Sequence, residues 1–109
     1  MNNTFDASKF DEKFNSWLTG CQALVDKYNA DLGFNWKTTL TAEPGHRYIR
    51  IVRQYLTNCS AWAFVDRTNG NVLKVANWKA PAKHARGNVF DTDNGMGWMT
   101  PHGPQYLRH

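Results

Sequence analysis

Residues 8–32, SKFDEKFNSWLTGCQALVDKYNADL, predict one long amphipathic helix. Ser8 can cap this helix by accepting a hydrogen bond from the N–H of Asp11, and Gly33 is the expected stop. Gly20 interrupts the helix at a cost of about 1 kcal/mol relative to alanine, and a glycine there would let a strand pack close. Apolar side chains recur at spacings of three and four and form one wide stripe, which we expect to be core: Phe10, Phe14, Trp17, Leu18, Cys21, Leu24, Val25 and Tyr28.

After the helix the apolar period changes to two, which indicates a sheet. Pro44-Gly45 fits a type II turn, and Asn69-Gly70 is the strongest short-range hairpin signal. Trp62 and Phe64 alternate with small residues and are expected on one face. The predicted strands cover about residues 35–42, 46–55, 60–66 and 71–76. The predicted fold class is therefore α+β: a single domain with one long N-terminal helix packed on a three- to four-stranded antiparallel meander.

Two further segments complete the domain, which spans residues 1–109. Residues 78–90 have too few apolar positions for a core element and are expected to form a basic loop. Residues 91–109 are rich in Gly, Asp, Asn and Pro. They predict an irregular C-terminal tail, held by Trp98 or Tyr106 if it is held at all.

The net charge of +4 is spread unevenly along the chain. Residues 36–109 hold ten Lys or Arg against four Asp or Glu, whereas residues 1–35 carry an acidic surplus. Between His46 and Phe90, Asp66 is the only acid. A basic half on a small protein favours polyanionic partners such as nucleic acid, although such a surplus can also serve solubility alone.

The candidate binding site is the basic loop itself. Lysine and arginine supply charge and hydrogen-bond donors for phosphate, and backbone N–H groups near a glycine can approach an anion closely. Aromatic side chains beside cations are typical of surfaces that bind single-stranded nucleic acid. The candidate ligand-binding residues are Trp78, Lys79, Lys83, His84, Arg86, Gly87 and Asn88 in the loop, together with Arg50 and Arg53 on a neighbouring strand. The competing interpretation is a solvated loop in which Arg86 pairs with Asp66 or Asp91.

The same loop carries a resemblance. The segment WKAPAKHARGN, residues 78–88, with Gly70 and Val72-Leu73-Lys74 before it and Phe90-Asp91 after it, resembles a family of small proteins encoded by tailed bacteriophages. The likeness covers roughly the second half of the chain and departs most at Asp93–Met99. That family has no established activity. The resemblance therefore implies a viral origin and a place in the host cytoplasm, but no particular chemistry.

We interpret the chain as a small phage protein that binds phosphate-bearing ligands, preferably nucleic acid, without catalysis. The alternative is a protein-interaction module that binds an acidic surface of a host enzyme, with Trp98 and Met99 as anchors. The third interpretation is a nucleotide- or phosphoester-directed hydrolase, in which His84 works with His102 or Asp91.

No cofactor or metal is expected. Asp91, Asp93 and Asn94 match only part of a calcium loop, because the later glutamate ligand is missing. Cys21 and Cys59 are predicted to be free thiols rather than a disulfide. No apolar run approaches the roughly 20 residues of a membrane span, so we expect a soluble, intracellular protein. Nothing in the sequence selects an oligomeric state.

Overall fold

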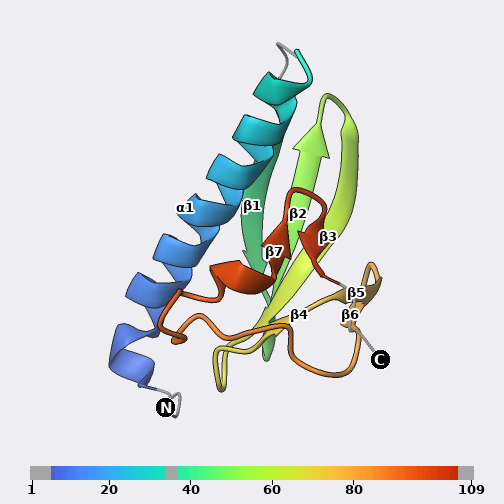
Figure 1. The fold of residues 1–109 in the computed structure, drawn as a ribbon. Helices are drawn as coiled ribbons and strands as arrows, with labels where there is room; N and C mark the ends of the chain where they lie inside the picture. The colour runs from blue at the N-terminus through green and yellow to red at the C-terminus, as the bar shows by residue number, and fades with distance from the viewer. Residues whose placement is uncertain (1–5, 34–36, 106–109) are drawn as a thin grey trace.

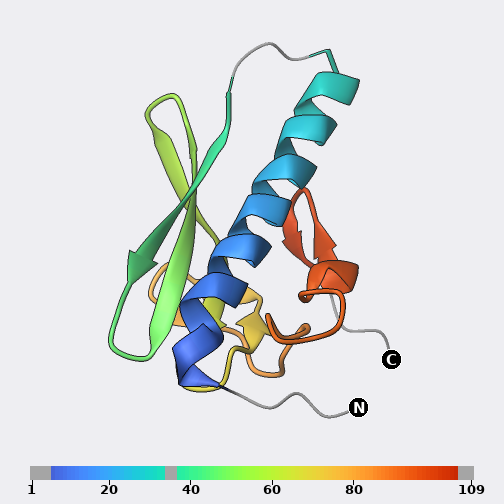
Figure 2. The same cartoon turned by 90° about the vertical axis from the view of Figure 1, so that its left-hand side faces the viewer.

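The computed structural model describes residues 6–33 and 37–105 and has the expected α+β fold (Figure 1). Helix α1 (Ala7–Asp31) precedes an antiparallel meander with the strand order β1-β2-β3-β4. The strands are β1 (Thr39–Pro44), β2 (Tyr48–Tyr55), β3 (Asn58–Asp66) and β4 (Val72–Leu73). Figure 2 shows α1 lying along one face of the twisted sheet. Residues 35 and 36 of the first expected strand lie outside the described residues.

The apolar stripe of α1 forms one side of the core. Phe10, Phe14, Trp17, Cys21 and Val25 are buried, and Leu18 and Leu24 pack against them. Tyr28 is the exception, at 36% exposed.

The ends of α1 are set by two residues. The cap is Asp6 rather than Ser8, because Asp6 Oδ1 accepts from the backbone N–H of Ser8 at 3.0 Å. Gly33 has a φ of 79°, a left-handed conformation that ends the helix as expected.

The sheet completes the core from the other side. Ile49 and Ile51 of β2 lie opposite Val65 and Ala63 of β3, and all four are buried. An extra residue in β3 shifts the register between Ile51 and Val52. This bulge lets Trp62 reach Trp17 in the core, with ring centroids 6.4 Å apart. The prediction that Trp62 and Phe64 share one face was therefore wrong, because a bulge breaks the period of two.

The outer edge of β1 is paired by a side chain of α1. Gln22 Nε2 donates to the carbonyl of Thr38 at 2.8 Å, and the N–H of Leu40 donates to Gln22 Oε1 at 2.8 Å. One amide thus satisfies a donor and an acceptor on the strand edge that no other described strand pairs, which fixes α1 against the sheet.

Two predicted turns are placed differently. Pro44 still belongs to β1, opposite Ile49, so it is not the centre of a turn. Asn69-Gly70 does mark the β3–β4 connection, but within a wider turn closed by the bond from Asp66 N–H to the carbonyl of Asn71 at 2.8 Å. Gly70 has a φ of 84°, which a glycine adopts at low cost.

The fourth expected strand, residues 71–76, is divided into two pieces. Its end forms β5 (Val75–Asn77), which pairs with β6 (Ala80–Pro81) inside the segment expected to be a loop. The hairpin contacts β3. It covers the sheet face away from α1, since its Trp78 lies against Arg50, whose neighbours Ile49 and Ile51 face the helix.

The C-terminal segment is irregular, as predicted, but it packs firmly. It contains the turn η1 (Met96–Trp98), β7 (Met99–Thr100) and β8 (Gly103–Pro104), and it runs alongside α1 (Figure 2). Met99 joins the core at 6% exposed, and Trp62 Nε1 donates to the carbonyl of Pro101 at 3.2 Å. Of the two residues expected to hold it, Trp98 is 37% exposed and Tyr106 lies outside the described residues.

Gly20 makes room for this segment rather than for a strand of the sheet. A Cβ at Gly20 would lie 3.0 Å from Met96 Sδ.

Candidate functional site

An open pocket of about 330 Å³ lies where the ends of the central strands meet the loop that follows β6. We call it the basic pocket. Its lining includes two cations from separate segments, Arg47 and Lys83, with His84 next to Lys83. Among the described residues it holds a single carboxylate. The lining residues are Arg47, Tyr48, Asp66, Asn69, Asn71, Leu73, Pro81, Ala82, Lys83, His84 and Ala85.

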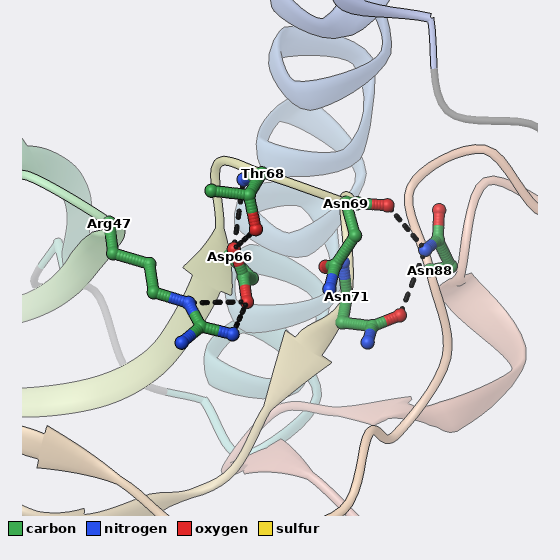
Figure 3. Close-up of polar contacts among 6 residues, drawn as sticks. All are labelled: Arg47, Asp66, Thr68, Asn69, Asn71 and Asn88. Atoms are coloured by element: carbon green, nitrogen blue, oxygen red, sulfur yellow. Dashed lines mark hydrogen bonds and ion pairs between the residues drawn. The ribbon is translucent and has the colours of Figure 1, made fainter.

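The carboxylate of the basic pocket is already engaged. Asp66 is 2% exposed, and its Oδ2 accepts from Arg47 Nε at 3.1 Å and from Arg47 Nη2 at 3.0 Å (Figure 3). Its Oδ1 accepts from the N–H and the hydroxyl of Thr68. Burial acts to raise the pKa of Asp66, but the bonds from Thr68 and Arg47 outweigh it and lower that pKa below its ordinary value. Asp66 therefore stays ionised and orients Arg47.

Arg47 has donor capacity left after this pairing. Its side chain is 59% exposed and its guanidinium lies 5.1 Å from the centroid of the Tyr48 ring. Nη1 has no hydrogen-bond partner within the described ranges. The arrangement presents a fixed, partly exposed cation to the pocket.

Three asparagines fix the opposite wall (Figure 3). Asn88 Nδ2 donates to the carbonyl of Asn69 and to Asn71 Oδ1, both at 2.9 Å, and Asn88 Oδ1 accepts from the N–H of Phe90 at 2.8 Å. Asn88 is 7% exposed. It was predicted to touch a ligand, but its side chain instead joins the β3–β4 turn to the end of the loop.

Lys83 and His84 are the two predicted ligand residues that line the basic pocket. Both are exposed, and His84 has a left-handed φ of 69°.

Arg86 does not belong with these residues, because it is 6% exposed. Its Nη1 donates to the carbonyl of Lys83 at 2.9 Å and to the carbonyl of His84. The prediction that Arg86 is displayed to a ligand was wrong, since the loop wraps around this guanidinium. The competing prediction of a bond to Asp66 or Asp91 was also wrong, since backbone carbonyls are its acceptors.

Gly87 is partly buried and pairs with the sheet. The N–H of Val72 donates to the carbonyl of Gly87 at 3.0 Å, so residues 86–89 continue the sheet beyond β4. Gly87 has a φ of 102°, and a Cβ there would lie 3.1 Å from Trp98 Cδ1. Its role is conformational, because a φ of 102° strains any residue with a side chain and a Cβ there would also crowd Trp98.

The remaining candidates divide between the two faces of the sheet. Trp78 is 43% exposed and lies against Arg50 on the face away from α1. Lys79 is exposed in the same β5–β6 hairpin and does not line the basic pocket. Arg53 lies opposite Leu40, a core residue, and directly opposed residues share a face. Arg53 therefore lies on the helix side, and the expectation that it joins the surface of the basic loop was wrong.

Sequence reasoning missed three polar lining residues: Arg47, Asn69 and Asn71. A signal was available, because Arg47 and Asn69 each lie in a turn between paired strands. Turns at the same end of a meander come together in space, and Arg47 and Asp66 flank neighbouring ends of β2 and β3.

The two residues proposed to work with His84 in catalysis, His102 and Asp91, have other contacts. His102 packs edge-on against Tyr28 of α1, with ring centroids 4.9 Å apart, and Asp91 accepts from the N–H of Asn88. Neither lines the basic pocket with His84.

The partial calcium loop and the two cysteines have ordinary structural surroundings. Asp93 accepts from the N–H groups of Gly95 and Gly97, and no group of three His, Cys, Asp or Glu placed to hold a metal ion occurs in residues 6–33 and 37–105. Cys21 and Cys59 are both free, as predicted, and burial raises the pKa of the Cys21 thiol. None of the described helices has the length and apolar character needed to cross a bilayer.

These features define an α+β protein with a long helix on one face of a meander. A basic pocket lies at the ends of the central strands. The chain belongs to a family of unknown function, DUF7717, whose model matches residues 8–101. No curated protein and no solved structure matches it.

Proposed function

We propose that this protein binds a phosphate-bearing ligand, preferably nucleic acid, in the basic pocket, and that it does so without catalysis. One observation carries the proposal: Arg47 and Lys83, from segments far apart in the sequence, line the same open pocket beside His84. Asp66, the only carboxylate among the described lining residues, is paired with Arg47, so it does not cancel the charge of Lys83.

The size and surroundings of the pocket favour one nucleotide of a single strand. A volume of about 330 Å³ is at the lower end of small-ligand pockets, which suits one nucleotide unit rather than a duplex groove. Trp78 and Tyr48 lie on the same face of the sheet as the pocket, and aromatic rings beside cations bind single strands by stacking. The hydrolase interpretation paired His84 with His102 or Asp91, and neither of these two residues lines the basic pocket.

The resemblance of residues 70–91 to tailed-phage proteins supports a place for this function in the cytoplasm of an infected host. The alternative partner, an acidic surface of a host enzyme, loses one of its two anchors because Met99 is buried. Trp98, at 37% exposed, is the anchor that remains for it.

The test is fluorescence anisotropy with a labelled single-stranded oligonucleotide over a series of salt concentrations. Lys83→Ala should weaken binding and reduce the salt slope by about 0.7, the value for one lost contact to a single strand. Lys9→Ala is the matched control, since Lys9 is an exposed cation in the first turn of α1.

Two results would count against the proposal. One is a wild-type protein that shows no binding at low salt, after which capture of a host protein by the wild type would support the alternative. The other is an equal loss in Lys9→Ala and Lys83→Ala, which would indicate diffuse charge attraction without a site.

A further inference from the structure

The peptide groups of Lys83, His84 and Ala85 separate a buried guanidinium from the basic pocket. Arg86 lies behind the loop, where its Nη1 donates to the carbonyls of Lys83 and His84. Lys83, His84 and Ala85 line the pocket, whereas Arg86 does not. The loop therefore has an inner side that faces Arg86 and an outer side that faces the pocket.

The direction of two N–H groups follows from this arrangement. In a planar trans peptide, the carbonyl of one residue and the N–H of the next point in opposite directions, and the described chain has no cis peptide bonds. The carbonyls of Lys83 and His84 point toward Arg86. The N–H groups of the same two peptides, those of His84 and Ala85, therefore point away from Arg86. The left-handed φ of His84 allows two successive peptides to face the same way, as in anion-binding nests.

Neither of these N–H groups has an acceptor among the residues that the structure describes. Within residues 6–33 and 37–105, no hydrogen bond is formed by the backbone N–H of His84 or of Ala85. The neighbouring N–H of Arg86, by contrast, donates to the carbonyl of Val72 at 2.7 Å. Two adjacent donors are therefore left for a ligand.

The guanidinium of Arg86, on the inner side of the loop, has no carboxylate partner among the described residues. Arg86 takes part in none of the three ion pairs formed among the described residues, and its buried Nε has no partner. Burial lowers the pKa of Lys74, and the positive charge of the nearby Arg86 lowers it further. A buried guanidinium without a counter-charge is costly, and an anion on the other side of the loop would supply that charge.

We propose that the backbone N–H groups of His84 and Ala85 bind one phosphate group in the basic pocket, with Lys83 as its cationic partner. Arg86 is a positioning residue that turns both N–H groups outward and does not touch the phosphate. This inference rests on the proposed function, because the phosphate belongs to the same ligand. It assigns His84 a role through its peptide group, not its imidazole.

The direct test is a titration of the nitrogen-15-labelled full chain with inorganic phosphate at constant ionic strength, followed by NMR. The amide proton signals of His84 and Ala85 should move downfield and saturate, with the largest shifts in the spectrum. Saturable shifts centred on other residues, or no saturable shift at all, would overturn the proposal.

Variants separate the peptide group from the side chain. His84→Gly keeps the N–H and readily adopts a left-handed φ, so phosphate affinity should stay within about twofold of the wild type. Lys83→Ala should bind about tenfold more weakly, as expected for the loss of a charged partner. Lys79→Ala, an exposed lysine of the preceding hairpin, should bind as the wild type does. Loss of binding in His84→Gly would show that the imidazole is the ligand and would refute the inference.

Arg86→Lys tests the positioning role. It keeps a positive charge but cannot hold two carbonyls with one planar group, so the amide shifts should shrink while the fold, measured by circular dichroism, remains. Unchanged shifts in a folded Arg86→Lys would refute the role of Arg86. If this variant does not fold, the wild-type titration and His84→Gly still decide the proposal.

A labelled oligonucleotide distinguishes this inference from the proposed function. Oligonucleotide binding without shifts at His84 and Ala85 would refute the N–H site and leave the function standing. Phosphate binding at these two amides without oligonucleotide binding would support the N–H site and refute nucleic acid as the ligand.

Discussion

The guanidinium of Arg50 lies over the indole ring of Trp78, with Cζ 4.1 Å from the ring centroid. Arg50 Nη1 also donates to the carbonyl of Trp78 at 3.2 Å, and Glu43 holds the same guanidinium through Nη2 at 2.6 Å. A cation on an aromatic face contributes about 0.5–1 kcal/mol at an exposed site. A side chain of β2 thus fixes the orientation of a tryptophan on the β5–β6 hairpin, while 43% of that tryptophan stays exposed.

This orientation predicts that Trp78 is a stacking platform for a base. Trp78→Ala should lower the affinity for a single-stranded oligonucleotide by about 1–3 kcal/mol, and Trp78→Phe by less, because a smaller ring still stacks. Fluorescence anisotropy measures the change. Trp98→Phe is the control, since Trp98 is similarly exposed but packs beside Gly87. Equal affinity of Trp78→Ala and the wild type would remove Trp78 from the ligand site.

The pair of Asp66 and Arg47 predicts how stability depends on pH. The pKa of Asp66 is lowered in the folded state, so its contribution is complete above the unfolded pKa and is lost as the pH falls through the folded pKa. At neutral pH, Asp66→Asn should lower the free energy of unfolding by about 1–3 kcal/mol, because Arg47 and Thr68 lose a charged acceptor.

Urea unfolding of both proteins at neutral pH and at about pH 3 measures this dependence. The difference in unfolding free energy between wild type and Asp66→Asn should narrow in acid, because protonation removes the same charge from the wild type. A difference that stays constant over this range would show that Asp66 acts through packing alone.

The side chain of Asn88 predicts a second stability effect. Asn88→Ala leaves the carbonyl of Asn69, Oδ1 of Asn71 and the N–H of Phe90 without their partner and should cost about 1–3 kcal/mol in unfolding free energy. Asn88→Asp should cost at least as much, since a carboxylate faces two acceptor oxygens. Urea unfolding measures both. An Asn88→Asp variant as stable as the wild type would contradict these assignments.

The helix and the meander could be predicted because they depend on periodicity. Apolar side chains repeat with the period of the element that buries them. The helical spacing from Phe10 to Val25 and the alternation around Ile49 and Ile51 therefore indicate which side chains are buried. The same reasoning misplaced Trp62, because one extra residue in β3 changes the face of a side chain without changing the local composition.

The candidate site was predicted less completely, for a different reason. Counting charges treats every lysine and arginine as exposed, and Lys83 fits this assumption whereas Arg86 does not. The acceptors of Arg86 are backbone carbonyls, which every residue carries, so no sequence pattern reveals them. Arg47 was missed because it reaches the pocket only through strand pairing, which brings it beside Asp66.

The turn between β2 and β3 contains a strained residue whose replacement should stabilise the protein. Leu56 has a left-handed φ of 55° and is 69% exposed, so it pays a steric cost and buries little apolar surface. That conformation costs a residue with a Cβ about 1–2 kcal/mol. Leu56→Gly removes this cost but adds backbone entropy to the unfolded chain, so we expect a net gain in unfolding free energy of about 0.5–1 kcal/mol.

Leu56→Asn should give a similar gain, because asparagine tolerates a left-handed φ with less unfolded-state entropy than glycine. Thr57→Gly is the matched control, since Thr57 is the next residue of the same turn and its φ is not positive. It should lower the unfolding free energy by about 0.5–1 kcal/mol through entropy alone. Urea midpoints at an unchanged m-value measure all three variants. If Leu56→Gly is destabilised as much as Thr57→Gly, the turn carries no strain at Leu56 and the exposed leucine must stabilise the hairpin through contacts.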